Sequence, residues 1–487
     1  MSSPLEGLEP RPVWSAFDAL RRVPRPSKRE EKVAAHVRAW AAEHGFEVRA
    51  DRSGNLVVAV PASPGREAAP TVVLQAHLDM VCEKNAGVEH DFDRDPIAVE
   101  VDGEWVRARG TTLGADNGIG VAAAMAAATD PQVVHGPLEL LFTLDEETGL
   151  NGAMALEASI VGGKLLVNLD TEEDDALYIG CAGAGGVAVE LDVERGGDPD
   201  AALRELVVRG LRGGHSGLDI IENRGNAIKI AVRALVAARE RGIDFGLVRL
   251  DGGGKANAIP RECTAQLRLT PEARSAFEAL LGEVRSEIEA DFGSVDPGLA
   301  IELRGPSEDP GWPPLLPADR DRLLHLISAS PHGVITMSRE VPGLVETSNN
   351  VASVATSERG ARLEHSFRSS VNAALDATSQ ALRSLARLAG GRVTVTRGYP
   401  GWRPDPDSPL VRRTARLYEE LFGEAPAVKA VHAGLECGIL AEKVPGLDAV
   451  SIGPEIRDPH SPDERVKIPT VGKFYRFLQA LLADLAA

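Results

Sequence analysis

The chain has 487 residues, of which 43% are hydrophobic and 26% are charged, a composition typical of a folded globular protein. Because a single hydrophobic core stops growing near about 250–300 residues, this length predicts at least two domains. The net charge of -19 repels phosphate backbones and anionic lipids, which argues against nucleic acid and membrane surfaces as partners.

The four cysteines, Cys82, Cys181, Cys263 and Cys437, are far apart and form no CxxC pair. Neither a cysteine-based zinc site nor a disulfide scaffold is therefore indicated. The N-terminal segment lacks the basic and apolar regions of a signal peptide. The longest Ala-rich apolar stretch, residues 118–129, is shorter than the ~20 residues that span a bilayer. We therefore expect a reduced, cytoplasmic protein.

The first part of the chain predicts an α/β domain. Residues 13–50 have apolar positions at helical spacing. Strand-length apolar runs and a buried Ala-rich helix follow, the runs at residues 56–60, 71–76, 138–144 and 165–169 and the helix at residues 118–129. Such alternation predicts a mostly parallel sheet that is covered by helices on both faces.

After about residue 186 the pattern changes to alternating strands and amphipathic helices, which predicts an inserted α+β domain. Asn257 leads into a strand that ends Gln266-Leu-Arg268, and Asn350 leads into one that ends Ser366-Phe-Arg368. This echo indicates two similar halves. The α/β pattern returns near residue 393. The sequence therefore predicts one domain formed by residues 1–186 and 393–487, interrupted by a second formed by residues 187–392.

Acidic and histidine side chains stand at the ends of the predicted strands or at the start of the Ala-rich helix: His77, Asp79, Asp116, Glu146, Glu147, Asp170 and His460. Ligands of open α/β sheets bind beyond the carboxyl ends of the strands. Each group alone is explained by a turn, a helix cap or an exposed charge. Together at one edge they would repel unless cations held them. The two histidines and three of these five carboxylates would form a mixed ligand set that suits Zn, Mn or Co, and a shared carboxylate allows a pair of ions.

The order of the motifs HLD, GADNG, DEETG, NLDTEE, GGHSG, NAIPRE, HAGLECG and DPHSPDE resembles the M20 metallopeptidases, and the resemblance extends over nearly the whole chain. It implies a three-layer, zinc-peptidase-like catalytic domain. It also implies that the inserted α+β domain is a lid built from two ferredoxin-like halves.

The resemblance implies two divalent metal ions as cofactors. His77 and Asp170 would bind one ion, Glu147 and His460 would bind the other, and Asp116 would bridge the two. Zn²⁺ is favoured, and Mn²⁺ or Co²⁺ accept the same ligands.

The resemblance also implies a catalytic pair. Asp79 would orient His77 through the second ring nitrogen, and Glu146 would be the general base that takes a proton from the attacking water. The peptide bond between Asp116 and Asn117 would be cis.

Three residues of the inserted domain would bind the substrate. The resemblance implies that His215 stabilises the oxyanion, that Asn257 contacts the substrate, and that Arg368 binds the C-terminal carboxylate. His215 and Asn257 are also explained as turn residues. Arg268 occupies the echoing strand position, so either arginine could be the one that binds the substrate carboxylate. The segment FRSS around Arg368 favours Arg368.

The activity implied by the resemblance is hydrolysis of unblocked dipeptides, including Xaa-His and carnosine-like substrates, by a water that two metal ions activate. The alternatives are another M20 amidohydrolase, namely a tripeptidase, an N-acyl-amino-acid deacylase or a carboxypeptidase, and a non-catalytic metal-binding relative. The expected partner is a small peptide, and the protein would be a monomer or a homodimer.

Overall fold

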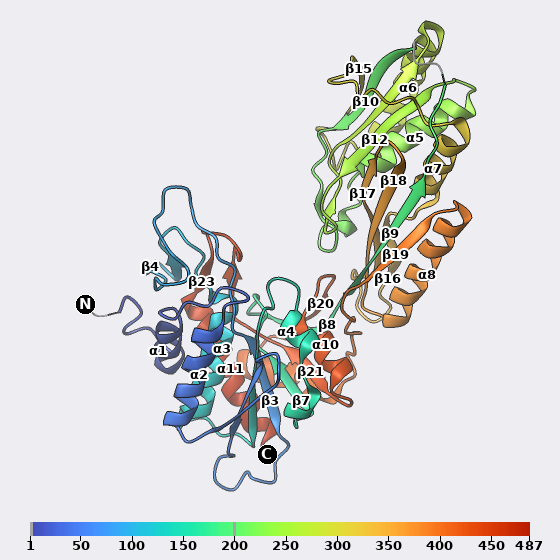
Figure 1. Cartoon of the computed structure of the whole chain (residues 1–487). Coiled ribbons are helices and arrows are strands. Elements are labelled where there is room, and N and C mark those ends of the chain that lie inside the picture. The colour runs from blue at the N-terminus through green and yellow to red at the C-terminus, as the bar shows by residue number, and fades with distance from the viewer. Residues whose placement is uncertain (1–2, 198–200) are drawn as a thin grey trace. The chain divides into compact units, whose positions relative to one another are not determined.

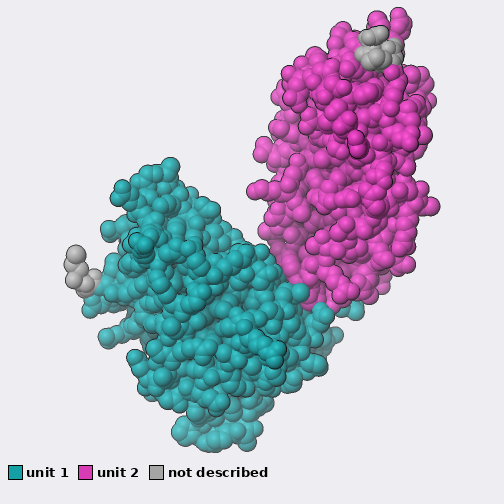
Figure 2. All heavy atoms as spheres, in the orientation of Figure 1, with its two compact units in different colours: residues 1–181, 402–430, 435–487 teal, residues 182–401, 431–434 magenta. Residues whose placement is uncertain are grey.

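The computed structural model describes residues 3–197 and 201–487, and the chain divides into two compact units. The first unit consists of residues 1–181, 402–430 and 435–487, and the second of residues 182–401 and 431–434; Figure 2 shows each in its own colour. The boundaries predicted after residues 186 and 392 differ from these. The reason at the second boundary is that strand β19 (Arg392–Arg397) pairs with β9 (Gly183–Asp192) in the sheet of the second unit.

The first unit is built on an eight-stranded sheet with the order β1-β2-β6-β3-β7-β21-β8-β20. Its four central strands run parallel: β6 (Leu138–Thr143), β3 (Val72–His77), β7 (Leu165–Asn168) and β21 (Asp448–Ser451). The flanking strands are β1 (Glu47–Ala50), β2 (Leu56–Val60), β8 (Ala176–Cys181) and β20 (Ala427–Val431). Among these, β1, β2 and β8 form antiparallel pairs. The sheet is thus mixed, and its parallel part is the centre.

A smaller four-stranded sheet in the same unit has the order β22-β23-β5-β4. Its strands are β22 (Ile456–Arg457), β23 (Arg465–Lys467), β5 (Trp105–Ala108) and β4 (Val99–Asp102).

Helices cover both faces of the large sheet and give three layers (Figure 1). One face shares a hydrophobic core with α1 (Arg11–Leu20), α2 (Glu31–Glu43), α3 (Ala115–Thr129), α9 (Pro409–Phe422) and α11 (Ile468–Leu485). The other face carries α4 (Asn151–Ala155) and α10 (Glu436–Lys443). Side chains alternate along a strand, so Leu74 and Ala76 of β3 join the core while Gln75 and His77 face the other layer. The α/β class and the layers predicted from the sequence are confirmed.

Helix α3 is buried on nearly all sides. Its sequence is rich in alanine and glycine, whose small side chains let neighbouring helices and strands approach closely. Neither α3 nor any other helix in the described residues is long and apolar enough to cross a membrane.

The second unit is built on a nine-stranded sheet with the order β15-β10-β14-β12-β17-β18-β9-β19, in which β16 also pairs with β17. In the part of the chain that the structure describes, the paired strands of this sheet are antiparallel. Besides β9 and β19, its strands are β10 (Ala202–Arg209), β12 (Gly246–Gly253), β14 (Cys263–Leu269), β15 (Ala300–Arg304), β16 (Gly333–Met337), β17 (Val345–Thr356) and β18 (Gly360–Ser369). A separate short ladder joins β11 (Gly214–His215) and β13 (Ala258–Ile259).

Two βαββαβ motifs share this sheet, as the predicted ferredoxin-like halves require. The first comprises β10, α5 (Ala227–Glu240), β12, β14, α6 (Pro271–Phe292) and β15. The second comprises β9, α7 (Pro317–Ala329), β17, β18, α8 (Asn372–Leu388) and β19. The first motif is inserted between β9 and α7 of the second, an interleaving that the sequence pattern did not predict.

The helices of the second unit begin at recognisable capping residues. The Asn226 side chain accepts hydrogen bonds from the first turn of α5, and Thr270 does the same for α6, where Pro271 follows at the first position. Apolar side chains of all four helices then pack in one core with the sheet. These local signals fix where both helices begin.

We expect the second unit to lose stability as the pH falls from about 6.5 to 4. Burial, assisted by the nearby Lys229 charge, lowers the pKa of His332 to about 4 and that of His365 to about 3. In the unfolded chain both imidazoles take up protons near pH 6.5. The unfolded state therefore binds more protons in this window, and stability rises with pH there. Between pH 6.5 and pH 4, the melting temperature of a His332→Gln/His365→Gln double variant should fall less than that of the wild type. We expect the difference between the two falls to be about 2–4 °C.

The measurement is thermal unfolding by circular dichroism across this pH range. His325→Gln is the matched control, because His325 is an exposed histidine on α7 of the same unit. A slope equal to that of the wild type in the double variant would contradict the prediction.

Candidate active site

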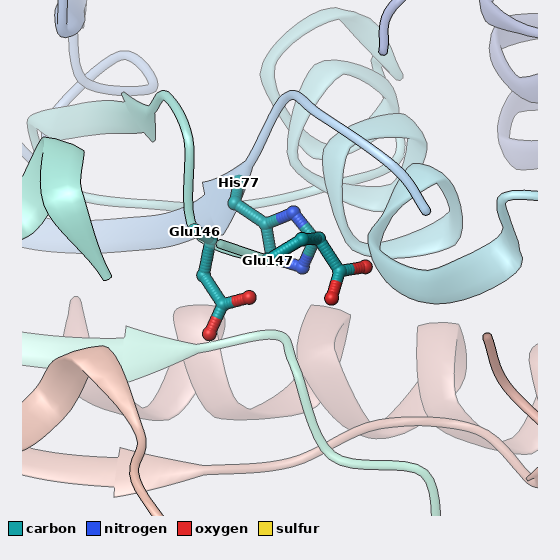
Figure 3. A group of neighbouring side chains, drawn as sticks. All are labelled: His77, Glu146 and Glu147. Atoms are coloured by element: carbon teal, nitrogen blue, oxygen red, sulfur yellow. The ribbon is translucent and has the colours of Figure 1, made fainter. Parts of the chain in front are cut away.

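The residues predicted as metal ligands lie together at the carboxyl ends of the central strands of the first unit. His77 is the last residue of β3, Asp170 follows β7, and Glu147 lies in the loop after β6. Asp116 stands in the first turn of α3, and His460 lies in the loop between β22 and β23. Figure 3 shows His77 at its strand end with the glutamates of the β6 loop beside it.

Asp116 belongs to two groups of side chains that could each hold a metal ion: one with His77 and Asp170, the other with Glu147 and His460. Its Oδ1 lies 3.1 Å from His77 Nε2, which is also 3.4 Å from Asp170 Oδ1. Its Oδ2 lies 3.0 Å from His460 Nε2, which is also 3.0 Å from Glu147 Oε2. Two atoms that bind one zinc ion tetrahedrally at about 2.0–2.2 Å are roughly 3.4 Å apart. Each group therefore has the dimensions of a metal site, and Asp116 offers one oxygen to each.

Unpaired oxygen atoms support the same interpretation. Glu147 Oε1 and Asp170 Oδ1 are buried and have no hydrogen-bond partner in the described part of the chain. A buried carboxylate oxygen without a partner is costly, and a divalent cation would satisfy it. Imidazole nitrogens with carboxylate oxygens form a donor set that suits Zn²⁺, Mn²⁺ or Co²⁺.

The histidines respond strongly to the surrounding carboxylates. Hydrogen bonds to Asp116 and Glu147 raise the pKa of His460 to about 11. Burial acts to lower the pKa of His77, but the Asp170 charge and hydrogen bonds with the nearby carboxylates raise it well above its usual value. Burial raises the pKa of Asp170 to about 6. Protons and divalent cations compete for these same lone pairs, so metal binding at this site would release protons.

Asp79 lies behind His77 on the side away from Asp116. His77 Nδ1 is 3.4 Å from Asp79 Oδ1, which leaves Nε2 to face Asp116 and Asp170. Asp79 also accepts hydrogen bonds from the backbone N–H groups of Glu146 at 3.0 Å and Glu147 at 3.2 Å. Burial acts to raise the pKa of Asp79, yet hydrogen bonding and the charge of His77 hold it at about 2. The ionised carboxylate thus orients both the imidazole and the β6 loop.

Glu146 offers a carboxylate beside His77 and Glu147 (Figure 3). It is not part of either group that shares Asp116. Burial, reinforced by Asp170 and other nearby carboxylates, raises its pKa well above the usual value, while His77 acts in the opposite direction. A raised pKa lets a carboxylate take up a proton from water, which is the task of a general base.

Two buried charged residues next to this site were not predicted. Arg25 and Glu464 contact the backbone of the loop that precedes Asp116. Their only sequence signal is membership in the segments PRPSKREE and HSPDE. The peptide bond between Asp116 and Asn117 is cis, as the resemblance implied.

The predicted substrate-binding residues lie together within the second unit. His215 on β11 pairs with Ala258 on β13, and the Ser216 N–H donates to the Asn257 carbonyl at 2.8 Å. Arg368 Nη2 lies 3.4 Å from His215 Nε2. The structure therefore brings His215, Asn257 and Arg368 to one place.

His215 and Arg368 have the surroundings expected of ligand-binding groups. The N–H groups of Gly217 and Leu218 point at His215 Nδ1, at 3.3 Å and 3.1 Å. Burial and the nearby Arg368 charge lower the pKa of His215. Arg368 is 7% exposed, donates to the Tyr399 hydroxyl at 3.2 Å, and has a buried Nε without a hydrogen-bond partner among the described residues.

Arg268 has a different environment. It lies on β14, in the strand position that corresponds to β18 in the second motif. Its guanidinium donates to Asp309 at 2.9 Å and to the carbonyl of Ala201 at 3.2 Å. A carboxylate of the chain itself thus already neutralises Arg268, whereas Arg368 contacts a histidine and a tyrosine.

Comparisons with known proteins point to one family. A model of peptidase family M20/M25/M40 matches residues 73–484. The chain is 40% identical over 486 residues to the cytosol non-specific dipeptidase of Escherichia coli (strain K12), and the alignment covers 100% of both chains. The structure is similar to that of aminoacylhistidine dipeptidase from Vibrio alginolyticus, with a TM-score of 0.92 and 41% identity over 98% of this chain and 97% of that one. Aminopeptidase PepT from Bacillus cereus shares the fold at a TM-score of 0.57 and 17% identity, over 99% of this chain and 100% of that one. The chain therefore belongs to peptidase family M20/M25/M40.

Proposed function

We propose that this protein is a metal-dependent dipeptidase that hydrolyses unblocked dipeptides, including Xaa-His and carnosine-like dipeptides. The observation that carries the proposal is Asp116, which offers one oxygen to each of two histidine–carboxylate groups beside Glu146. Two relatives that match over nearly their full length at 40% and 41% identity are named dipeptidases.

The two groups that share Asp116 would hold two divalent ions. His77 and Asp170 would complete one site, and Glu147 and His460 the other, with Zn²⁺ as the best fit and Mn²⁺ or Co²⁺ as acceptable ions. Such an ion pair lowers the pKa of a water molecule towards about 7 and polarises a peptide carbonyl.

Four side chains would carry out the remaining tasks. Glu146 takes up the proton of the attacking water and passes it to the leaving amine. His215 donates from Nε2 to the oxyanion that forms from the substrate carbonyl. Arg368 binds the C-terminal carboxylate with its planar guanidinium, and Asn257 contacts the substrate. An arginine that binds the C-terminal carboxylate of the substrate explains a preference for short peptides with a free C-terminus.

The alternative activities share the same ligand set. A tripeptidase, an N-acyl-amino-acid deacylase and a carboxypeptidase differ from a dipeptidase in substrate fit and not in metal chemistry. A non-catalytic relative is disfavoured because Glu146 and both ligand groups are present. We further propose a cytoplasmic location, which agrees with the four free cysteines, and a small peptide as the partner of a monomer or homodimer.

Metal analysis combined with a substrate panel tests this function. We expect two divalent ions per chain by mass spectrometry, and at least tenfold higher kcat/KM for Xaa-His dipeptides than for a tripeptide or an N-acyl-amino acid. Chelation should abolish activity, and added Zn²⁺, Mn²⁺ or Co²⁺ should restore it. Activity that survives complete removal of metal would contradict metal dependence, and faster tripeptide cleavage or deacylation would contradict the dipeptidase assignment.

A further inference from the structure

The loop that delivers Asp116 directs its backbone N–H groups at a single carboxylate. Glu464 Oε2 accepts from Leu113 at 2.7 Å and from Gly114 at 2.9 Å. Glu464 Oε1 accepts from Ala115 at 2.7 Å and from Asp116 itself at 3.1 Å. Glu464 is only 2% exposed, so water does not compete for these bonds.

Arg25 holds the same loop from its carbonyl side. Its Nη2 donates to the carbonyl of Gly114, and its Nη1 donates to the carbonyls of Leu78 at 3.0 Å and Asp79 at 2.9 Å. Leu78 directly follows His77, so one guanidinium ties the loop after β3 to the loop before α3. Arg25 is 3% exposed, and these carbonyl contacts replace its solvation.

A glycine makes this close approach possible. A Cβ atom at Gly114 would lie 2.5 Å from Arg25 Nη2 and 2.8 Å from the sulfur of Met80. The φ of +69° at Gly114 is also one that residues with side chains rarely adopt. The loop is therefore shaped to lie between a buried guanidinium and a buried carboxylate.

We propose that Glu464, together with Arg25, is a positioning residue that presets Asp116 between the two metal groups. The proposal rests on the proposed function, because it takes those groups to be metal sites. Glu464 lies in the same β22–β23 loop as His460, so the contacts join the segments that carry His77, Asp116 and His460. With the loop held in place, metal binding does not have to order the bridging carboxylate.

It follows that the affinity for both ions depends on Glu464. Asp116 belongs to both groups, whereas Asp170 belongs to one and Glu147 and His460 to the other. Loss of the preset loop should therefore weaken both sites together. Partners that orient a metal ligand typically change metal affinity by about 10–100-fold.

The test is Glu464→Gln, which keeps the size of the side chain. Whichever way the amide turns, its NH₂ group faces two of the backbone N–H donors, which it cannot accept from. We expect the dissociation constants of both ions, measured by calorimetric titration of metal-free protein, to rise about 10–100-fold. The visible absorption spectrum of the Co²⁺-loaded variant should change as well. Asp463→Asn is the matched control, since Asp463 is the neighbouring, exposed carboxylate and its removal changes net charge equally.

The stability of the metal-free protein separates positioning from a purely structural role. A purely structural residue would lower the melting temperature of the metal-free protein and leave both dissociation constants unchanged, and this result in Glu464→Gln would overturn the proposal. Weaker binding of only one ion would also overturn it.

Arg25→Lys is the second variant, for use if Glu464→Gln does not fold. One ammonium cannot reach all three carbonyls, so the same rise in both dissociation constants is expected. A wild-type chain that takes up fewer than two ions would instead overturn the proposed function.

Discussion

Replacing Glu146 with alanine is expected to lower kcat for dipeptide hydrolysis by about 10²–10⁴-fold while two metal ions stay bound. The two groups that share Asp116 do not include Glu146, so the ligand atoms remain. The variant loses the Glu146 carboxylate, whose pKa is raised by burial. It therefore loses the acceptor for the proton of the attacking water.

Steady-state kinetics and metal content, measured on the same preparation, check this prediction. Glu43→Ala serves as the control, because Glu43 is an exposed glutamate at the end of α2. Activity within about tenfold of wild type would remove Glu146 from the role of general base. Loss of one ion would show that Glu146 is a ligand.

Replacing Arg368 with alanine is expected to lower kcat/KM for dipeptides by about 100-fold, mainly through KM. Removal of a charge-assisted hydrogen bond to a carboxylate costs roughly 3 kcal/mol, which corresponds to this factor. The effect should be specific to the substrate carboxylate. The wild type should prefer a dipeptide over its C-terminal amide, and Arg368→Ala should lose this preference.

Arg268→Ala is the matched control, because Arg268 occupies the corresponding strand of the other βαββαβ motif. Its guanidinium is paired with Asp309, so its loss should leave kcat/KM within about threefold of wild type. An equal loss of activity in both variants, or an unchanged preference for the free carboxylate in Arg368→Ala, would contradict the assignment.

Local chemistry made much of the fold predictable. Helix α6, for example, begins at a threonine cap followed by a proline, and both are signals that the sequence carries locally. The gathering of His77 and Asp170 was predicted because parallel strands end at the same edge of a sheet. Strand direction could not be predicted, because a short apolar run such as β8 carries no signal for its direction. Antiparallel pairing at the flanks of the large sheet therefore emerged only from the three-dimensional arrangement.

The sequence by itself determined the α/β class, the family resemblance and the residues that converge at the strand ends. It favoured Arg368 over Arg268 only through the segment FRSS, because both arginines lie at echoing strand positions. Tertiary contacts give the physical difference between the two arginines, since Asp309 neutralises Arg268 and His215 lies beside Arg368. Glu464 was overlooked for a related reason. Its partners are backbone N–H groups, which every non-proline residue has, so only the folded chain shows where four of them converge.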